Sequence, residues 1–283
     1  MFMIKLLPLL FVFLSIQLNT QTVDTLMVRY HTDGTTDTLP ISKIDSITFG
    51  YDTIWGCNGL TSLTYNGYSY DLVEIGNQCW FKENLQTTTY KDGTPIDYPG
   101  TDNAVWLDNH YGVPTIGAYA WYDNDSSTYA STYGALYNWH AVDNPIGLCP
   151  VGWHVPSDAE WFILENYLKA NGYNYDGSTT GNKYAKAMAD TILWNSDTGV
   201  GTVGHTDYPT YRNKSGFSGL PGGYRNYNGD YYSIGDYGDW WSSSQYNANY
   251  AWARNLNYST INLTRGYHGG IKGYGFSVRC LRD

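Results

Sequence analysis

Short runs in which apolar and polar residues alternate make up most of this chain, and turn residues separate them. Residues 57–86 hold three such runs, at 63–65, 68–75 and 79–81. The first two flank an Asn66-Gly67 pair, which is a strong signal for a tight β-hairpin. The pattern therefore predicts three consecutive strands, since strict alternation places every second side chain on one face of a sheet.

A second alternating pattern lies near the N-terminus, where residues 23–31 and 39–49 flank an Asp33-Gly34 turn. This is also a hairpin signature, and its small size indicates an appended element rather than an independent domain. Farther along, Gly and Pro interrupt residues 92–114 so often that we expect a long surface loop there.

Helical spacing of apolar residues begins after a capping-box pattern at Ser157-Asp158-Ala159-Glu160. Gly172 closes this run, so a helix is predicted between them. Weaker patterns predict a short helix within residues 133–142 and another at 182–191. Three residues define the apolar face of the main helix: Trp161, Leu164 and Leu168.

The composition agrees with a fold of many short strands and tight turns. Aromatic residues make up 17% of the 283 residues, with 29 Tyr and 11 Trp, and 31 residues are Gly. These residue types favour strands and turns over a helical bundle. The formal net charge is −10 and the sequence has no clustered basic stretch, so no nucleic-acid partner is expected.

The first twenty residues have the pattern of a secretory signal peptide. Lys5 precedes an apolar run over residues 6–14, and the chain turns polar from Ser15. The run is too short to span a bilayer, and no later stretch is long enough. A buried N-terminal strand is the alternative for this run. We expect an exported protein whose remaining chain divides into a hairpin segment at 21–50 and a domain at 51–283.

Four cysteines in an exported chain imply two disulfides, and three pairings are possible. We predict Cys57–Cys79 and Cys149–Cys280, of which the second closes a long loop. Metal binding is the alternative for a chain with four cysteines, but no two of these have the C-x2-C spacing of a zinc site.

Five blocks rich in aromatic and Gly residues stand in order along the chain: Tyr133-Gly134-Ala135-Leu136-Tyr137-Asn138-Trp139, Cys149-Pro150-Val151-Gly152-Trp153-His154, Gly216-Phe217-Ser218-Gly219-Leu220-Pro221-Gly222-Gly223-Tyr224-Arg225, Trp241-Ser242-Ser243-Ser244 and Gly275-Phe276-Ser277-Val278-Arg279-Cys280. Together they resemble the Fibrobacter succinogenes major paralogous domain (FISUMP) family over residues 57–283. The resemblance implies an α+β architecture similar to C-type-lectin-like and formylglycine-generating-enzyme-like domains. Such a domain has two main helices around a small twisted antiparallel sheet, with long irregular loops. The hairpin segment resembles one common on exported Bacteroidetes proteins.

The candidate binding surface lies in the last sixty residues. Ten tyrosines occur from Tyr224 to Tyr274 among Asn, Asp, Ser and Gly, and this mixture is typical of recognition surfaces. The tail also resembles the variable proteins of diversity-generating retroelements, in which adenine-directed copying rewrites Asn codons. Positions that such copying can reach are the predicted ligand-binding residues: Tyr227, Tyr231, Tyr232, Asp236, Tyr237, Tyr246, Asn247, Asn249, Tyr250, Ala253, Ser259, Thr260, Asn262, Thr264, Tyr267, His268, Ile271 and Tyr274.

Other tail residues are assigned to the scaffold. Alternation predicts that about half of the tyrosines pack on the sheet. Arg279 is expected to make structural hydrogen bonds or an ion pair rather than to contact a ligand. Five apolar residues are expected in the core: Trp240, Trp241, Trp252, Phe276 and Val278.

No catalytic site is expected. The six histidines are scattered, and no pair has the spacing of a helical metal site. The two predicted disulfides use all four cysteines, which leaves none for the oxygen chemistry of formylglycine generation. Asp123, Asn124 and Asp125 offer oxygen ligands for Ca²⁺, although a polar turn is the favoured interpretation of this segment. No other cofactor is expected.

These patterns predict an extracellular or cell-surface protein that binds a protein or glycan on another cell, a phage or a host surface. One alternative is a carbohydrate-binding module of fixed specificity, in which exposed Trp and Tyr stack on sugar rings. A structural or adhesive extracellular protein without a discrete site is the other.

Overall fold

The computed structural model describes residues 13–14, 26–30, 36–40, 56–112, 114–266 and 270–283. They belong to two compact units, residues 1–53 and 54–283, and each unit is described by itself.

The first unit contains one three-stranded antiparallel sheet. Strands β2 (Leu26–Tyr30) and β3 (Thr36–Pro40) form a hairpin in the predicted segment, but β3 begins three residues before the predicted second run at 39–49. The Asp33-Gly34 turn and residues 41–49 lie outside the described residues. Strand β1 (Phe13–Leu14) pairs with β2, so the described part of the predicted leader is extended. Cleavage of that leader stays a prediction.

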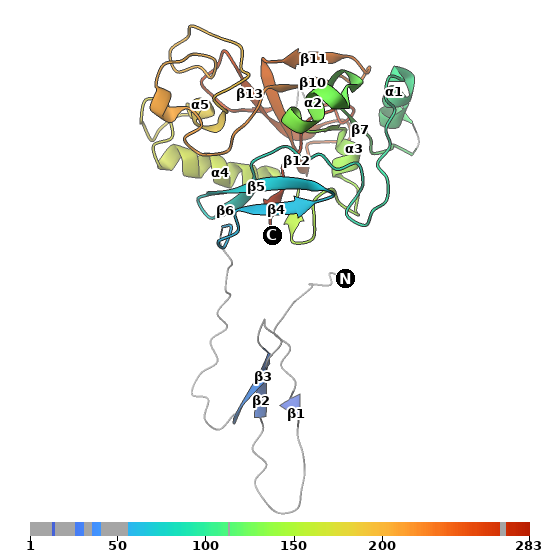
Figure 1. The fold of residues 1–283 in the computed structure, drawn as a ribbon, viewed down its shortest axis with the longest axis vertical. Coiled ribbons are helices and arrows are strands. Elements are labelled where there is room, and N and C mark those ends of the chain that lie inside the picture. Colours follow the sequence, from blue (N-terminus) through green and yellow to red (C-terminus); the bar gives the residue numbers. More distant parts are fainter. Residues whose placement is uncertain (1–12, 15–25, 31–35, 41–55, 113, 267–269) are drawn as a thin grey trace, which may run out of the picture. The chain divides into compact units, whose positions relative to one another are not determined.

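The second unit is α+β, as predicted, and contains two five-stranded sheets (Figure 1). The three strands predicted in residues 57–86 are confirmed, and they lie in the first of these sheets. Asn66 and Gly67 between β4 and β5 both have positive φ angles, of 48° and 83°, which is the backbone that a tight hairpin turn requires. The strand order is β4 (Ser62–Tyr65), β5 (Tyr68–Ile75), β6 (Gln78–Phe81), β15 (Leu281–Arg282) and β9 (Trp153–His154).

The other five-stranded sheet is built from the C-terminal part of the chain. All its neighbouring strands are antiparallel except β10 and β12, which run parallel. A separate two-stranded ladder joins β7 (Tyr119–Ala120) to β8 (Leu136–Tyr137). The order in the C-terminal sheet is β11 (Tyr231–Ile234), β10 (Gly222–Arg225), β12 (Tyr237–Gln245), β13 (Ala251–Asn257) and β14 (Thr264–Gly266).

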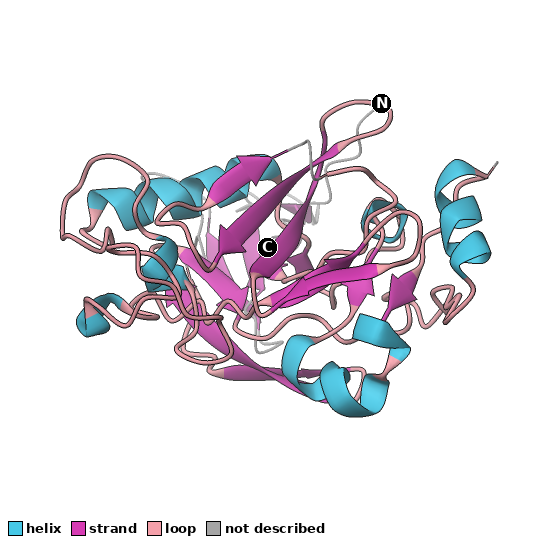
Figure 2. Cartoon of the chain, turned by 90° about the horizontal axis from the view of Figure 1, so that it is seen from above, coloured by secondary structure: helices cyan, strands magenta, loops and turns pink. Residues whose placement is uncertain are grey.

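Helices lie around the outside of these strands (Figure 2). The longest is α4 (Asp158–Ala170), which begins at the predicted capping box of Ser157 and Glu160 and buries Trp161, Leu164 and Leu168 as expected. The remaining helical segments are α1 (Asn103–Tyr111), α2 (Ser126–Tyr133), α3 (Trp139–Val142), α5 (Ala185–Met188), η2 (Tyr122–Asn124) and η3 (Pro209–Tyr211).

Three sequence predictions about helices need correction. Residues 92–114 are not all loop, because Asp102 caps helix α1 by accepting a hydrogen bond from the Val105 backbone at 3.0 Å. Residues 133–142 do not form one helix, since Tyr133 ends α2, Leu136 belongs to strand β8, and α3 covers only the last four residues. The helix predicted at 182–191 is limited to the four residues of α5.

Two aromatic clusters lie on opposite faces of β12. Trp240 packs near Phe217, with ring centroids 5.6 Å apart, and Trp241 packs against Phe276 at 4.5 Å. Both tryptophans, Phe276 and Val278 are buried, as predicted. The prediction that Trp252 lies in the core is wrong, because this residue is only half-buried and the guanidinium of Arg265 lies 3.5 Å from its ring centroid.

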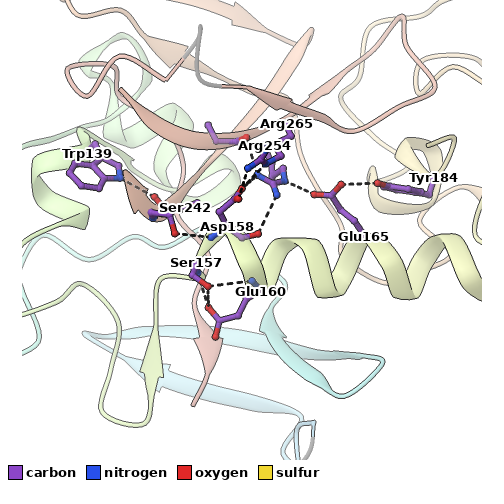
Figure 3. A network of polar contacts seen from close by, with 11 residues as sticks. Trp139, Ser157, Asp158, Glu160, Glu165, Tyr184, Ser242, Arg254 and Arg265 are labelled. Atoms are coloured by element: carbon purple, nitrogen blue, oxygen red, sulfur yellow. Dashed lines mark hydrogen bonds and ion pairs between the residues drawn. The ribbon is translucent and has the colours of Figure 1, made fainter. Parts of the chain in front are cut away.

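Helix α4 is joined to the C-terminal sheet by a closed network of charges (Figure 3). Arg254 is fully buried and donates from Nε to Glu165 at 2.6 Å and from Nη1 to Asp158 at 2.8 Å. Tyr184 donates to the other oxygen of Glu165 at 2.9 Å, and Arg265 pairs with Asp158 at 2.7 Å. Because every charge has an opposite partner, this face of the sheet is held to the helix electrostatically as well as by packing.

Both predicted disulfides are present, Cys57–Cys79 and Cys149–Cys280. The second joins the segment before β9 to the segment before β15, two strands that pair with each other. Arg279, next to Cys280, is 1% exposed and donates to the carbonyls of Phe217 and Ser218. It therefore has the structural role expected from the sequence.

Candidate functional site

The face of the C-terminal sheet that points away from α4 carries a transverse row of Tyr and polar side chains. Tyr232 is paired with Tyr224, and Asp239 with Asn255. The parallel register pairs Gly223 with Gly238, so the next residues, Tyr224 and Asp239, lie side by side on the other face. We call this face, with Tyr224, Tyr232, Tyr237, Asp239 and Asn255, the tyrosine face.

Tyrosine rings from three separate segments stack beside this row. The ring centroids of Tyr232 and Tyr224 are 5.8 Å apart, those of Tyr224 and Tyr274 5.7 Å, and those of Tyr274 and Tyr227 5.9 Å. Tyr111 of helix α1 meets Tyr227 edge-on at 6.5 Å. We call these five residues the tyrosine ladder. Its outer members are exposed, Tyr232 to 42% and Tyr111 to 63%, so the ladder reaches the surface at both ends.

Beside the ladder lies a buried carboxyl group. Asp239 is 7% exposed and accepts a hydrogen bond from Nδ2 of Asn255 at 2.8 Å. Burial raises the pKa of Asp239 to about 7, and the hydrogen bond from Asn255 only partly offsets this. Burial, together with Tyr274, Asp239, Tyr237 and Tyr232, raises the pKa of Tyr224 to about 12. These acidic groups are therefore close enough to act on one another.

The structure gathers one group of predicted ligand-binding residues at the ladder end of the hairpin β12–β13. Tyr250 forms a bridge with Ile271, and it raises the pKa of Tyr274, after burial and Tyr227. The backbone N–H of Lys272 donates to Asn249 at 3.1 Å. The group assembled at this end with the ladder is Tyr227, Tyr232, Asn247, Asn249, Tyr250, Ile271 and Tyr274. Tyr246 lies in the same turn, but its ring packs against Trp252, with centroids 4.9 Å apart.

A second group lies at the opposite end of the same hairpin, about 20 Å away along β13. The Tyr258 N–H donates to Asp236 at 2.9 Å there, and Asn195 donates to the Asp236 carboxylate at 2.8 Å. Asp236 directly precedes Tyr237, so this end of the hairpin meets the tyrosine face on the side of Tyr224. The predicted residues at this end are Asp236, Ser259, Thr260 and Asn262.

The other predicted positions are divided among different surroundings. Tyr237 lies on the tyrosine face, and Thr264 is exposed on β14 opposite Asn255. Ala253 is a poor candidate for contact, because it is buried at 5% exposure. Tyr231 faces the other way, over the guanidinium of Arg225, and donates to Asn124 at 2.9 Å. Tyr267 and His268 lie outside the described residues.

Sequence reasoning missed four residues of this site. Tyr224 was placed with the scaffold motifs, Tyr111 was placed in a loop, and Asp239 and Asn255 were not singled out. The alternation in β12, which puts Tyr237, Asp239 and Trp241 on one face, contained a signal for Asp239. The sequence does not show which strand lies beside β12. Its neighbour β10 runs parallel to it, and β11 separates the two strands along the chain.

An open depression of about 520 Å³ adjoins the exposed end of the ladder at Tyr232. Two of the three calcium candidates, Asp123 and Asn124, line it. Asp125 instead caps helix α2, accepting from the Thr128 N–H at 3.1 Å. This is the polar-turn role considered for the segment. The lining residues are Thr101, Asn103, Asp123, Asn124, Gly229, Asp230, Tyr231 and Tyr232.

Two histidines far apart in sequence meet near the ladder. His110 Nδ1 lies 3.2 Å from His140 Nε2. Burial, together with Lys272, lowers the pKa of His110. Burial, followed by His110 and Lys272, lowers the pKa of His140 to about 4, so the pair is neutral at pH 7 and shares one hydrogen bond. No group of three or more His, Cys, Asp or Glu side chains suited to a metal ion occurs within the described part of the chain.

The fold and the site define a class of protein: an α+β domain closed by two disulfides, with an aromatic and acidic surface on one sheet. Two disulfides fit an extracellular protein. None of the helices in the described ranges has the length and apolar character needed to cross a bilayer. The chain belongs to the Fibrobacter succinogenes major domain (Fib_succ_major) family, whose model matches residues 73–282. No curated protein and no solved structure matches it significantly. The family expected from the sequence motifs is thus confirmed.

Proposed function

We propose that this protein is an extracellular ligand-binding protein that acts by binding rather than by catalysis. The tyrosine ladder is the observation that carries this proposal. Five tyrosines from α1, the β10–β11 hairpin and the segment before Phe276 converge there. A packed core would bury such rings completely, whereas here two remain substantially exposed. Clustered, exposed aromatic side chains mark contact sites.

The proposal includes a C-type-lectin-like fold for the scaffold that carries the ladder. Support comes from the α+β class, the curled antiparallel sheets and the long irregular segment between α5 and β10. Such a scaffold would fix the backbone through Cys149–Cys280 and the buried tryptophans. Surface residues between these fixed points would then be free to change without loss of the fold.

Diversification by a retroelement is the finer form of the proposal. Seven of the positions reachable from Asn codons are gathered with the ladder, which is the arrangement that a diversified binding surface needs. We expect the flanking DNA to contain a near-copy of the segment that encodes Gly222 to Arg282, beside a reverse transcriptase gene. Mismatches confined to template adenines would support diversification. If no copy exists, the surface has a fixed specificity.

A fixed glycan site is the second candidate, and the depression beside Tyr232 favours it. Asn103, Asp123 and Asp230 supply amide and carboxylate groups of the kind that bond sugar hydroxyls, and Tyr232 supplies a partly exposed ring. Retention on immobilised polysaccharides, lost in Tyr232→Ala and kept in Tyr208→Ala, would support this candidate. Tyr208 is a matched control because it is 40% exposed and does not line the depression.

A further inference from the structure

Among the residues that the structure describes, Asp239 has no basic partner on the tyrosine face. Its single side-chain hydrogen bond within the described residues comes from Asn255. The influences on its pKa are burial and that hydrogen bond, with no Lys or Arg among them. A buried carboxylate without a cation is costly to keep ionised, so its presence beside a partly exposed surface needs an explanation.

The arginines of this sheet all lie on the opposite face. Arg254 pairs across the strands with Trp240, and Arg265 pairs with Arg254. Arg225 follows Tyr224 on β10 and therefore points away from it. Its guanidinium donates to Gly229 O at 3.0 Å and stacks over Trp106 at 4.3 Å. None of these cations neutralises Asp239.

Among the described residues, the side chains placed beside Asp239 are phenolic or neutral. They are Tyr224 from β10, Tyr237 from β12 itself and Asn255 from β13, while Tyr232 and Tyr274 lie next to Tyr224. Lys272 is engaged elsewhere, with Nζ 3.2 Å from Gln245 Oε1 and 4.3 Å from the Trp139 ring centroid. A carboxyl group among phenolic oxygens makes a surface of negative potential.

We propose that the tyrosine face recognises an arginine or lysine side chain of a protein partner, with Asp239 as the residue that determines specificity. This rests on the proposed function and names the chemistry of the ligand. The cation pairs with the carboxylate of Asp239, which Asn255 holds in place through its amide. Hydroxyl oxygens of Tyr224 and its neighbours accept the remaining N–H groups, because phenols accept as well as donate hydrogen bonds.

The ring geometry favours a cation over a sugar at this position. A sugar stacks on a free ring face, but the inner rings of the ladder already lie against each other. The planes of Tyr227 and Tyr274 differ by only 6°, and those of Tyr224 and Tyr274 by 26°. Stacked rings leave mainly edges and hydroxyl groups for a ligand, and these suit a donor-rich guanidinium or ammonium group.

Binding of small probes to the whole chain tests the proposal. The probe is Nα-acetyl-arginine amide, and the matched neutral probe is Nα-acetyl-citrulline amide, in which a urea replaces the guanidinium. Binding is followed by NMR through the Asn255 side-chain amide. We expect binding of the citrulline probe to be about tenfold weaker or worse, since it lacks the charge. Because Asp239 must be ionised to pair with a cation, affinity should fall about tenfold from pH 8 to pH 6.

Variants separate this inference from the proposed function. Asp239→Asn should weaken the arginine probe about tenfold, whereas Asp97→Asn should leave it unchanged. Asp97 is a suitable control because it also accepts a hydrogen bond from an Asn amide, at 2.6 Å from Asn109, but is exposed and lies outside the C-terminal sheet. A melting curve for each variant verifies folding.

Equal binding of both probes, or an unaffected Asp239→Asn variant, overturns the cation site. If methyl β-glucoside perturbs the ladder instead, the cation site fails and the proposed binding function stands with a glycan ligand. If no probe perturbs the ladder, the cation site also fails, and the genomic test alone decides the proposed function.

Discussion

The two faces of the C-terminal sheet each hold a buried ionisable side chain, yet their surroundings differ. On the α4 face, Arg254 is fully buried between Asp158 and Glu165, and each of these carboxylates has a further partner. On the tyrosine face, the hydrogen-bond partner of the Asp239 side chain in the described part of the chain is the Asn255 amide, and no cation pairs with it there. The two groups lie on neighbouring strands, because Asp239 pairs with Asn255 and Arg254 precedes Asn255.

This difference separates structural charge from charge that is open to a partner. A closed network of ion pairs gains little free energy from binding a ligand, since its donors and acceptors already have partners. An unneutralised carboxyl near the surface gains free energy when a cation arrives. The α4 face therefore stabilises the domain, and the tyrosine face is where recognition is expected.

The largest effect is expected when the closed network is broken. Arg254→Leu leaves Glu165 and Asp158 without their buried cation, and removal of one partner from a buried pair typically costs about 3–5 kcal/mol. The free energy of unfolding, measured by urea denaturation, should fall by this amount. Arg212→Leu is the control, because Arg212 makes a single exposed hydrogen bond to the Thr191 carbonyl, and it should change stability by less than about 0.5 kcal/mol. Equal effects of the two changes would contradict the assignment of Arg254 to a buried network.

On the tyrosine face, by contrast, removal of the charged side chain is expected to raise the free energy of unfolding. Burial raises the pKa of Asp239 to about 7 in the folded protein, from an ordinary value of 3.8, so folding favours its protonated form. Its stabilising contribution is present below about pH 4 and is lost as the pH rises toward 7. Asp239→Asn removes this loss and should be more stable than the natural protein by about 2–4 kcal/mol at pH 8, and by about 1 kcal/mol at pH 4.5.

Urea denaturation at several pH values measures this difference, with Asp97→Asn as the control at an exposed position outside the C-terminal sheet. The control should change the free energy of unfolding by less than about 0.5 kcal/mol. A destabilised Asp239→Asn variant at pH 8 would mean that Asp239 already has a cationic partner. A variant that is more stable but binds less would identify a residue kept for function at a cost in stability.

The sequence predicts features that depend on neighbouring residues better than features that depend on distant contacts. Local patterns were sufficient for α4, because the Ser157 to Glu160 capping box is contained in four residues, and for the β4–β5 turn. Helix α1 was missed because its apolar residues do not share one face: Trp106 is fully buried, while Val105 and Leu107 are 40% and 36% exposed. Both disulfides and the family were predicted, whereas the exposure of Trp252 was not.

The site was harder to predict because it depends on long-range register. The Asn-codon argument selected residues by type and position, and it therefore joined two groups that lie at opposite ends of β13. It also passed over Tyr224, Asp239 and Asn255, since the parallel pairing of β10 with β12 cannot be read from either strand alone. The placement of Asp239 and Arg254 on opposite faces depends on this strand register too, so the sequence alone does not predict it.

The smallest effect is expected from Arg265, the exposed member of the α4-face network. It is 37% exposed at its side chain and makes two hydrogen bonds to Asp158, at 3.0 and 2.7 Å. Although burial alone would raise the pKa of Asp158, Arg265 and Arg254 together hold it below its usual value. Arg265→Gln leaves Asp158 paired with Arg254, so the loss should be that of a surface ion pair, about 0.5–1 kcal/mol. This loss should shrink in 1 M NaCl, where exposed charges are screened over about 3 Å, whereas the loss in Arg254→Leu should persist. If Arg265→Gln were as damaging as Arg254→Leu at either salt concentration, the network would depend on its exposed half, and the contrast between the two faces would rest on surface charge rather than on burial.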